Sequence, residues 1–179
     1  MQAQGWFGGS FFCKIALGRG VKKTYLDKIM DHLAALSELN RETHIVRQAG
    51  VIPFRRRPDG LRVLLITSRD TGRWVIPKGH VEEGQTAAAA AAVEAYEEAG
   101  LVGVLSDFPL GFYTYGKRQS SGVALPATVE VYSLEVAAQM KKWPERKQRR
   151  LEWMDVATAA GLVHEPGLSV LMLRLGEII

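Results

Sequence analysis

The stretch from Thr86 to Gly100 constrains the fold of this chain more than any other part of its sequence. Thr86 is a residue type that caps the N-terminus of a helix, and six alanines follow it. Gly100 stands where the left-handed residue that ends a helix is expected. The thirteen residues Ala87–Ala99 therefore predict a helix about 20 Å long, against which the neighbouring segments must pack.

Short apolar runs on both sides of this helix predict strands. The basic segment Arg55–Gly60 contains Pro58-Asp59-Gly60, which is typical of a turn and indicates a hairpin with a basic tip. The expected strands are Ile45–Phe54, Leu61–Thr67, Trp74–Ile76, Leu101–Leu105, Leu110–Tyr115, Ala127–Val136 and Arg149–Met154. The two helices expected near the C-terminus are Asp155–Leu162 and Pro166–Ile178. Because strands and helices intermix, the fold class is α/β (α+β) with a mixed sheet.

The length of 179 residues favours one main domain, which we place at residues 44–179. Residues 1–43 read as an arm that begins with a glycine-rich stretch and continues into an amphipathic helix over Thr24–Leu39. The apolar face of that helix has two candidate partners, the domain itself or a second subunit of a homodimer.

Composition excludes several classes of protein. Hydrophobic residues make up 47% and charged residues 23%, which excludes a disordered chain. No apolar run approaches the roughly 18 residues of a membrane span, so no membrane partner is expected. The first twenty residues lack the pattern of a signal peptide, and the single cysteine, Cys13, cannot form an intramolecular disulfide. These features favour the cytoplasm.

Three carboxylates share one face of the predicted helix. Glu94, Glu97 and Glu98 are spaced i, i+3 and i+4, close to the end where the helix dipole is negative. Like charges at this spacing destabilise a helix, and no Lys or Arg on the helix offsets them. A hard divalent cation would offset them through carboxylate oxygens, and a solvated acidic face is the alternative.

The segment Gly79–Leu101 resembles the Nudix box, in which a glycine, a glutamate, an Arg-Glu pair and a Glu-Glu pair recur at fixed spacing. Gly79 opens it, and the other positions that match are Glu94, Ala95, Glu97, Glu98, Gly100 and Leu101. The resemblance implies the α/β/α sandwich of that family over about residues 44–179. It also implies a MutT-like pyrophosphatase, a hydrolase of acid anhydrides.

Two positions depart from the box. Gln85 replaces its first glutamate, and Val93 replaces the arginine that orients the glutamates in the family. Another base, either Lys78 or an arginine distant in sequence, is then expected to compensate, so that Val93→Arg raises turnover only if the role is unfilled. A degenerate member that binds a nucleotide or polyphosphate without hydrolysing it is the alternative.

The resemblance also assigns roles. Glu94, Glu97, Glu98 and the carbonyl of Gly79 would hold Mg²⁺ or Mn²⁺, and the same three glutamates are the candidate catalytic residues, with Glu94 as metal ligand and base. Lys78 would contact a substrate phosphate. His80 is expected in a loop, where solvation is the usual fate of a histidine. Glu130 and Glu145 are candidates for an extra metal ligand from outside the box.

The run from Trp74 to Gly84 resembles the branch of the family that acts on diphosphoinositol polyphosphates and dinucleoside polyphosphates. Residues 61–140 carry six Lys and Arg against nine Asp and Glu, whereas both flanks are basic. Arg55 and Arg57 at the hairpin tip, and the run Arg146–Arg150, could attract such polyanions. The expected partner is thus a small phosphoanhydride. RNA 5′-end hydrolysis ranks lower, because no platform of aromatic and basic residues for nucleic acid is seen.

Overall fold

The computed structural model describes residues 45–118 and 124–179, and within them the chain forms eight strands and three helices. The strands are β1 (Val46–Arg57), β2 (Gly60–Thr67), β3 (Trp74–Val75), β4 (Lys78–His80), β5 (Leu101–Leu105), β6 (Gly111–Arg118), β7 (Ala124–Gln139) and β8 (Leu151–Asp155). The helices are α2 (Ala87–Ala99), α3 (Val156–Leu162) and α4 (Pro166–Ile178). The arm and helix predicted within residues 1–43 lie outside the described residues.

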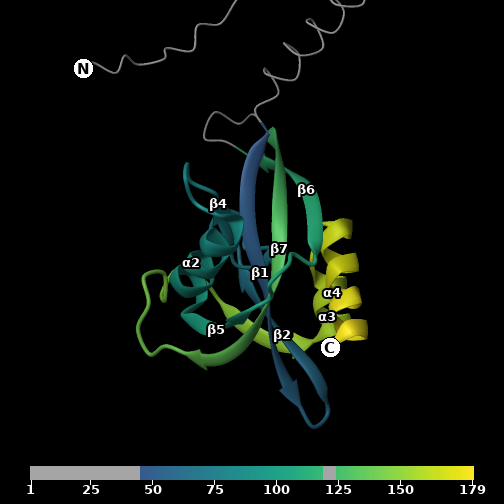
Figure 1. The fold of residues 1–179 in the computed structure, drawn as a ribbon. Helices are drawn as coiled ribbons and strands as arrows, with labels where there is room; N and C mark the ends of the chain where they lie inside the picture. Colours follow the sequence, from purple (N-terminus) through teal and green to yellow (C-terminus); the bar gives the residue numbers. More distant parts are fainter. Residues whose placement is uncertain (1–44, 119–123) are drawn as a thin grey trace, which may run out of the picture. The chain divides into compact units, whose positions relative to one another are not determined.

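A mixed sheet forms the middle layer of this domain (Figure 1). At its centre β1 pairs in parallel with β7 and antiparallel with both β2 and β4. Strands β3 and β8 pair with β2, and strands β5 and β6 pair with β7. The predicted mixed sheet is therefore confirmed.

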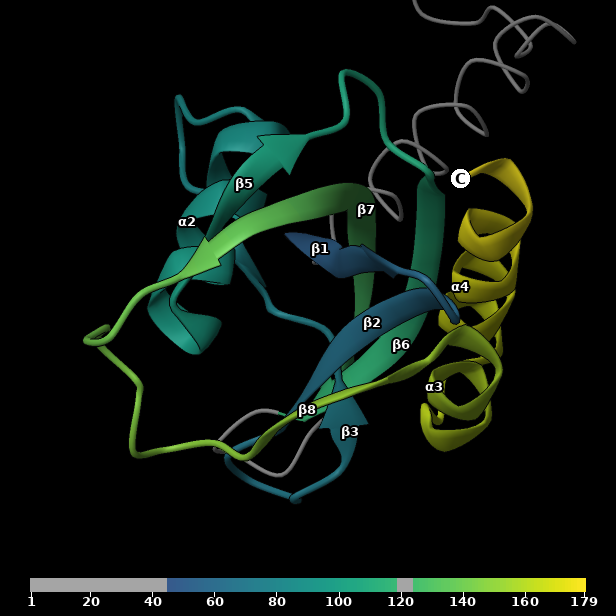
Figure 2. The same ribbon diagram turned by 90° about the horizontal axis from the view of Figure 1, so that it is seen from below.

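Helices cover both faces of the sheet (Figure 2). Helix α2 packs on one face through its alanines, and α3 and α4 pack on the other. Because both faces are covered, β2 is apolar in consecutive positions, and all four residues Val63–Ile66 are fully buried. This arrangement is the α/β/α sandwich expected from the sequence.

The ends of α2 follow the prediction. The hydroxyl of Thr86 accepts a hydrogen bond from the backbone N–H of Ala89 at 3.2 Å, which caps the N-terminus. Gly100 has φ 68° and ends the helix in the left-handed conformation. None of the three helices in the described segments is both long and apolar enough to cross a bilayer.

The structure differs from the sequence prediction at several element ends and in one added strand; β7, for example, runs over Ala124–Gln139 rather than Ala127–Val136. The hairpin strands run further into the basic segment, so that only Pro58 and Asp59 remain between β1 and β2. His80, which was expected in a loop, ends the short strand β4, whose pairing to β1 compensates for the low strand propensity of its central Gly79. The last strand begins at Leu151 rather than Arg149.

Candidate active site

A cavity of about 800 Å³ is bordered by α2, β4, β6 and the segments that precede β3 and β8. Two sets of ionisable side chains line it. The acidic cluster comprises Glu94, Glu97 and Glu98 of α2 together with Glu145. The basic cluster comprises Lys78 and His80 of β4 and Lys117 of β6. A cavity that carries both charges suits a polyanion bound together with a cation.

Glu94 is seated against the backbone of β4. Its carboxylate occupies the space in which a Cβ at Gly79 would stand, so this close approach requires glycine. The pairing of Gly79 with Ala49 of β1 fixes the position of the strand under Glu94. Burial, and then the neighbouring charge of Glu97, raises the pKa of Glu94.

Glu98 is the buried member of the acidic cluster, with a side chain only 8% exposed. Its Oε2 accepts a hydrogen bond from the backbone N–H of Lys78 at 2.9 Å, and its Oε1 pairs with the guanidinium of Arg149. Burial raises the pKa of Glu98 to about 7, although the charge of Arg149 and the N–H of Lys78 both favour the carboxylate.

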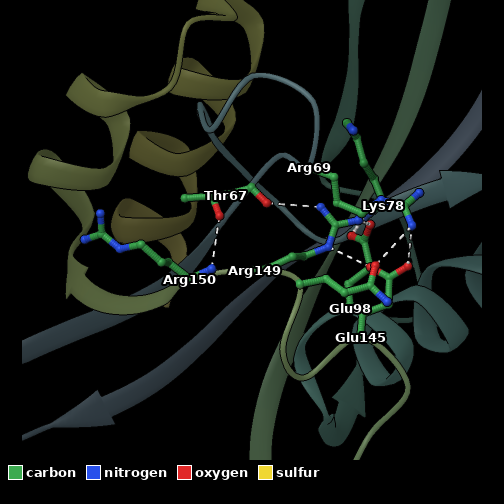
Figure 3. A network of polar contacts seen from close by, with 8 residues as sticks. Thr67, Arg69, Lys78, Glu98, Glu145, Arg149 and Arg150 are labelled. Carbon is green, nitrogen blue, oxygen red and sulfur yellow. Dashed lines mark hydrogen bonds and ion pairs between the residues drawn. The ribbon is translucent and has the colours of Figure 1, made fainter. Parts of the chain in front are cut away.

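Arg149 joins three segments of the chain (Figure 3). Besides Glu98, its guanidinium donates to Oε2 of Glu145 at 2.8 Å and to the backbone carbonyl of Thr67 at 3.1 Å. Arg69, from the loop after β2, donates to the other oxygen of Glu145 at 3.0 Å. The two arginines thus hold Glu145 beside the glutamates of α2.

One member of the basic cluster lies over a tyrosine ring. Lys78 Nζ lies 5.4 Å from the centre of the Tyr115 ring, and the Tyr115 hydroxyl donates to Gln48 at 2.6 Å. The side-chain nitrogen of Lys117 lies within hydrogen-bond distance of Nε2 of His80. Burial lowers the pKa of Lys78, of Lys117 and of His80, and the charge of Lys117 contributes at His80. A bound anion would stabilise the charged forms of these groups.

The structure brings together most of the predicted site residues but not all. Glu94, Glu97, Glu98, Gly79 and Lys78 line one cavity, and Glu145, a candidate for an extra metal ligand, joins them. Three other candidates lie elsewhere in the described chain.

Arg55 and Arg57 belong to the β1–β2 hairpin and do not line the cavity; Arg55 lies 4.3 Å from the centre of the Trp153 ring. Glu130 accepts a hydrogen bond from Tyr132 at 2.6 Å, also outside this cavity. Lys117 and Arg69 were not predicted for this site, and Arg149 was predicted only as part of a basic run. Because these residues lie in other segments than the box, local spacing carries no signal for them.

The donor chemistry of the acidic cluster suits a hard divalent cation, since it offers carboxylate oxygens and the nearby carbonyl of Gly79. In the described residues, no three His, Cys, Asp or Glu side chains converge closely enough to hold an ion as they stand. Glu97 is exposed and can change rotamer at little cost, whereas Glu98 is held by Arg149. The acidic cluster therefore has the ligand chemistry that a divalent cation prefers, and Glu97 is the side chain that can move toward the ion.

Comparison with known proteins defines the class. The model of the NUDIX domain family matches residues 44–172. This chain therefore belongs to the Nudix family.

Its relatives include Nudix hydrolase 12, mitochondrial, of Arabidopsis thaliana, which is 35% identical over 112 residues, 57% of this chain and 52% of the relative. Diphosphoinositol polyphosphate phosphohydrolase 2 of Rattus norvegicus is 30% identical over 124 residues, 67% of this chain and 65% of the relative. The chain spans about half the length of the plant relatives Nudix hydrolases 12 and 13.

Solved structures share the fold. The Ap4A hydrolase of C. elegans superposes with a TM-score of 0.55 at 20% identity, covering 73% of this chain and 96% of that one. The dihydroneopterin triphosphate pyrophosphohydrolase of E. coli superposes with a TM-score of 0.58 at 20% identity, covering 74% of this chain and 96% of that one. These likenesses support the α/β/α sandwich described above.

Proposed function

We propose that this chain is a metal-dependent pyrophosphohydrolase that cleaves a phosphoanhydride bond of a small polyphosphorylated substrate by attack of water on phosphorus. The observation that carries the proposal is the meeting of the acidic and basic clusters in one cavity. Phosphates need cationic partners, and the water that attacks them needs a base nearby. The acidic cluster alone would repel the substrate.

Glu94, Glu97, Glu98 and the carbonyl of Gly79 would hold Mg²⁺ or Mn²⁺. When bound, such an ion supplies neutralisation of phosphate charge and a more acidic water molecule. Glu94 suits the role of base, because burial and Glu97 raise its pKa and so strengthen its affinity for a proton. In the reaction the water oxygen bonds to phosphorus, Glu94 accepts the water proton, and the bridging oxygen leaves with the electron pair of the broken bond.

Lys78 and Lys117 would bind substrate phosphates as point charges, with His80 held by Lys117. We favour dinucleoside polyphosphates or diphosphoinositol polyphosphates, because the cavity has room for several phosphates and relatives bear the name diphosphoinositol polyphosphate phosphohydrolase. Arg55 and Arg57, outside the cavity, would act only by long-range attraction. The proposed location is the cytoplasm, as the composition suggests; Nudix hydrolases 12 and 13 of Arabidopsis are named mitochondrial.

A substrate panel tests this function. Diadenosine polyphosphates, diphosphoinositol compounds, ADP-ribose and nucleoside triphosphates are incubated with the full chain in Mg²⁺ and in chelator, and the products are separated. We expect turnover of a polyphosphate only with metal, and a loss of roughly 100-fold or more in Glu97→Gln, because metal-assisted charge stabilisation contributes several kcal/mol. Glu83→Gln, an exposed glutamate outside the cavity, is the matched control. Absence of turnover with every substrate would reject the proposal.

A second candidate is a Nudix-fold module that binds the same ligands without cleaving them. Val93 and Gln85, at the two positions where the chain departs from the box, favour it; Val93 is 44% exposed and Gln85 accepts a hydrogen bond from the backbone of Glu82. Tight ligand binding by calorimetry, together with equal background release in Mg²⁺, in chelator and in Glu97→Gln, would support this module.

A further inference from the structure

We propose that Arg149 is a positioning residue of the active site, which holds Glu98 and Glu145 in place from outside the helix that carries the box. The inference rests on the proposed function, because the site to be positioned is the hydrolytic one. It assigns to a residue 51 positions after Glu98 a task that no side chain of α2 performs.

Helix α2 carries no cationic side chain. Ala87–Ala99 contains no Lys or Arg, and its glutamates stand in the C-terminal half, where the helix dipole is negative. The position that precedes Glu94 is Val93, which is 44% exposed and whose side chain offers neither charge nor hydrogen bond. The positive charge that balances these glutamates must therefore come from another segment of the chain.

Arg149 is buried together with its carboxylate partners. Its side chain is 6% exposed, and the side chains of its partners Glu98 and Glu145 are 8% and 19% exposed. A guanidinium presents several N–H groups in a fixed plane, and here they reach a carboxylate of α2, a carboxylate of the segment before β8 and the carbonyl of Thr67. An ammonium is a point charge and cannot match this set of directions.

Backbone hydrogen bonds anchor the segment that carries Arg149. The backbone N–H of Glu145 donates to the carbonyl of Glu97 at 3.0 Å, and the N–H of Met140 donates to the carbonyl of Gly100 at 2.8 Å. On the other side, the N–H of Thr67 donates to the carbonyl of Arg150 at 3.0 Å. Arg149 is therefore placed by the end of α2 and by the end of β2 together, and its contacts are not those of a loose surface pair.

Arg149 holds the carboxylates of Glu98 and Glu145. With Arg149 in place both oxygens of Glu98 have a donor, and Glu145 is held by Arg149 and Arg69 beside the same cavity. Without it a buried carboxylate loses its counter-charge, which disfavours the observed arrangement of the site. We expect the orientation of the acidic cluster, and hence its affinity for a divalent ion, to depend on Arg149.

Arg149→Ala, Arg149→Lys and Arg174→Ala test the inference in the full chain. Arg174 of α4 is the matched control, because it is exposed and does not line the cavity. Mn²⁺ affinity is measured by calorimetry, kcat and KM by product release, and folding by circular dichroism. For Arg149→Ala we expect losses of about 10- to 100-fold in Mn²⁺ affinity and in kcat with a smaller change in KM, as is typical when a residue that orients ligands is removed. Arg174→Ala stays within about twofold.

Chemical rescue separates positioning from mere stability. Millimolar guanidinium chloride should restore a measurable part of kcat to Arg149→Ala, whereas ammonium chloride at the same concentration should not. Arg149→Lys keeps the charge, so it should fold even if Arg149→Ala does not, yet it should lose kcat through its single point of attachment. Folded Arg149→Ala or Arg149→Lys with wild-type Mn²⁺ affinity and kcat would overturn the inference. A wild type without turnover rejects the proposed function instead, and Mn²⁺ affinity then still decides the role of Arg149.

Discussion

The carboxylate of Glu94 lies against Gly79, in the volume that a Cβ would fill at any other residue. A helix and a short strand thereby approach more closely than side chains normally allow. The contact joins the first residue of the box to Glu94, the first box glutamate that this chain keeps, and it places a half-buried carboxylate against the backbone of β4. The absence of a Cβ at Gly79 therefore determines where the negatively charged carboxylate of Glu94 lies.

Gly79→Ala should displace the Glu94 side chain. Because a Cβ would overlap the carboxylate, Glu94 must leave its seat, and we expect kcat to fall by about 10- to 100-fold, the effect typical of a misplaced ligand. Steady-state kinetics check it. Gly161→Ala in α3, where a Cβ meets nothing within 4 Å, is the control and should keep full activity.

Lys117→Met should weaken substrate binding more than it slows the chemical step. Lys117 lines the cavity with His80, and a hydrogen bond to a phosphate contributes about 1.5 to 3 kcal/mol, so KM should rise about 10-fold or more. The measurement is KM for the best substrate of the panel. Lys141→Met removes an exposed lysine outside the cavity and should leave KM unchanged. Equal KM values in the two variants would remove Lys117 from the binding site.

Local sequence signals were sufficient for the elements that carry their own pattern. Helix α2 has a cap, a uniform helix-forming run and a terminal glycine, and the central strands are apolar over several residues, so both could be predicted. Strand β4 could not, because its three residues have low strand propensity and owe their conformation to pairing with β1. The box glutamates could be predicted by spacing. The partner of Glu98 could not, since Arg149 reaches it only after the chain has formed three further strands and returned to the end of β2.

Stability without metal should depend on pH through Glu98. Its pKa is about 7 in the folded chain against 4.5 for an unperturbed glutamate, so between these values the folded state binds more protons than the unfolded state. The contribution of Glu98 to the free energy of unfolding is therefore largest below pH 4.5 and decreases as the pH rises to about 7. Urea unfolding in chelator at several pH values, for wild type and Glu98→Gln, measures this. The two pH profiles should differ across that window, and parallel profiles would contradict the assignment.

Gly100→Ala should destabilise the domain. Gly100 has φ 68°, and a Cβ there would overlap the Trp143 ring, so backbone strain and crowding combine. We expect a loss of about 1 to 3 kcal/mol in the free energy of unfolding, measured with urea. Gly161→Ala provides the opposite sign, because alanine is favoured over glycine inside a helix by about 0.5 to 1 kcal/mol. A Gly100→Ala variant as stable as wild type would mean that Trp143 moves aside without cost.

Val93→Arg tests whether α2 still needs a cation of its own. A new arginine at this exposed position would lie one turn before Glu97, where it can form an i, i+4 pair worth only about 0.3 to 0.5 kcal/mol. Glu98 is already paired with Arg149, so we expect kcat of Val93→Arg to stay within about threefold of wild type. In the Arg149→Ala background the acidic cluster lacks the cation that Arg149 supplies, and there the same substitution should raise kcat. Product release from the four chains gives the coupling between the two positions directly, and a several-fold gain in the wild-type background would show that Arg149 leaves the role of the missing box arginine unfilled.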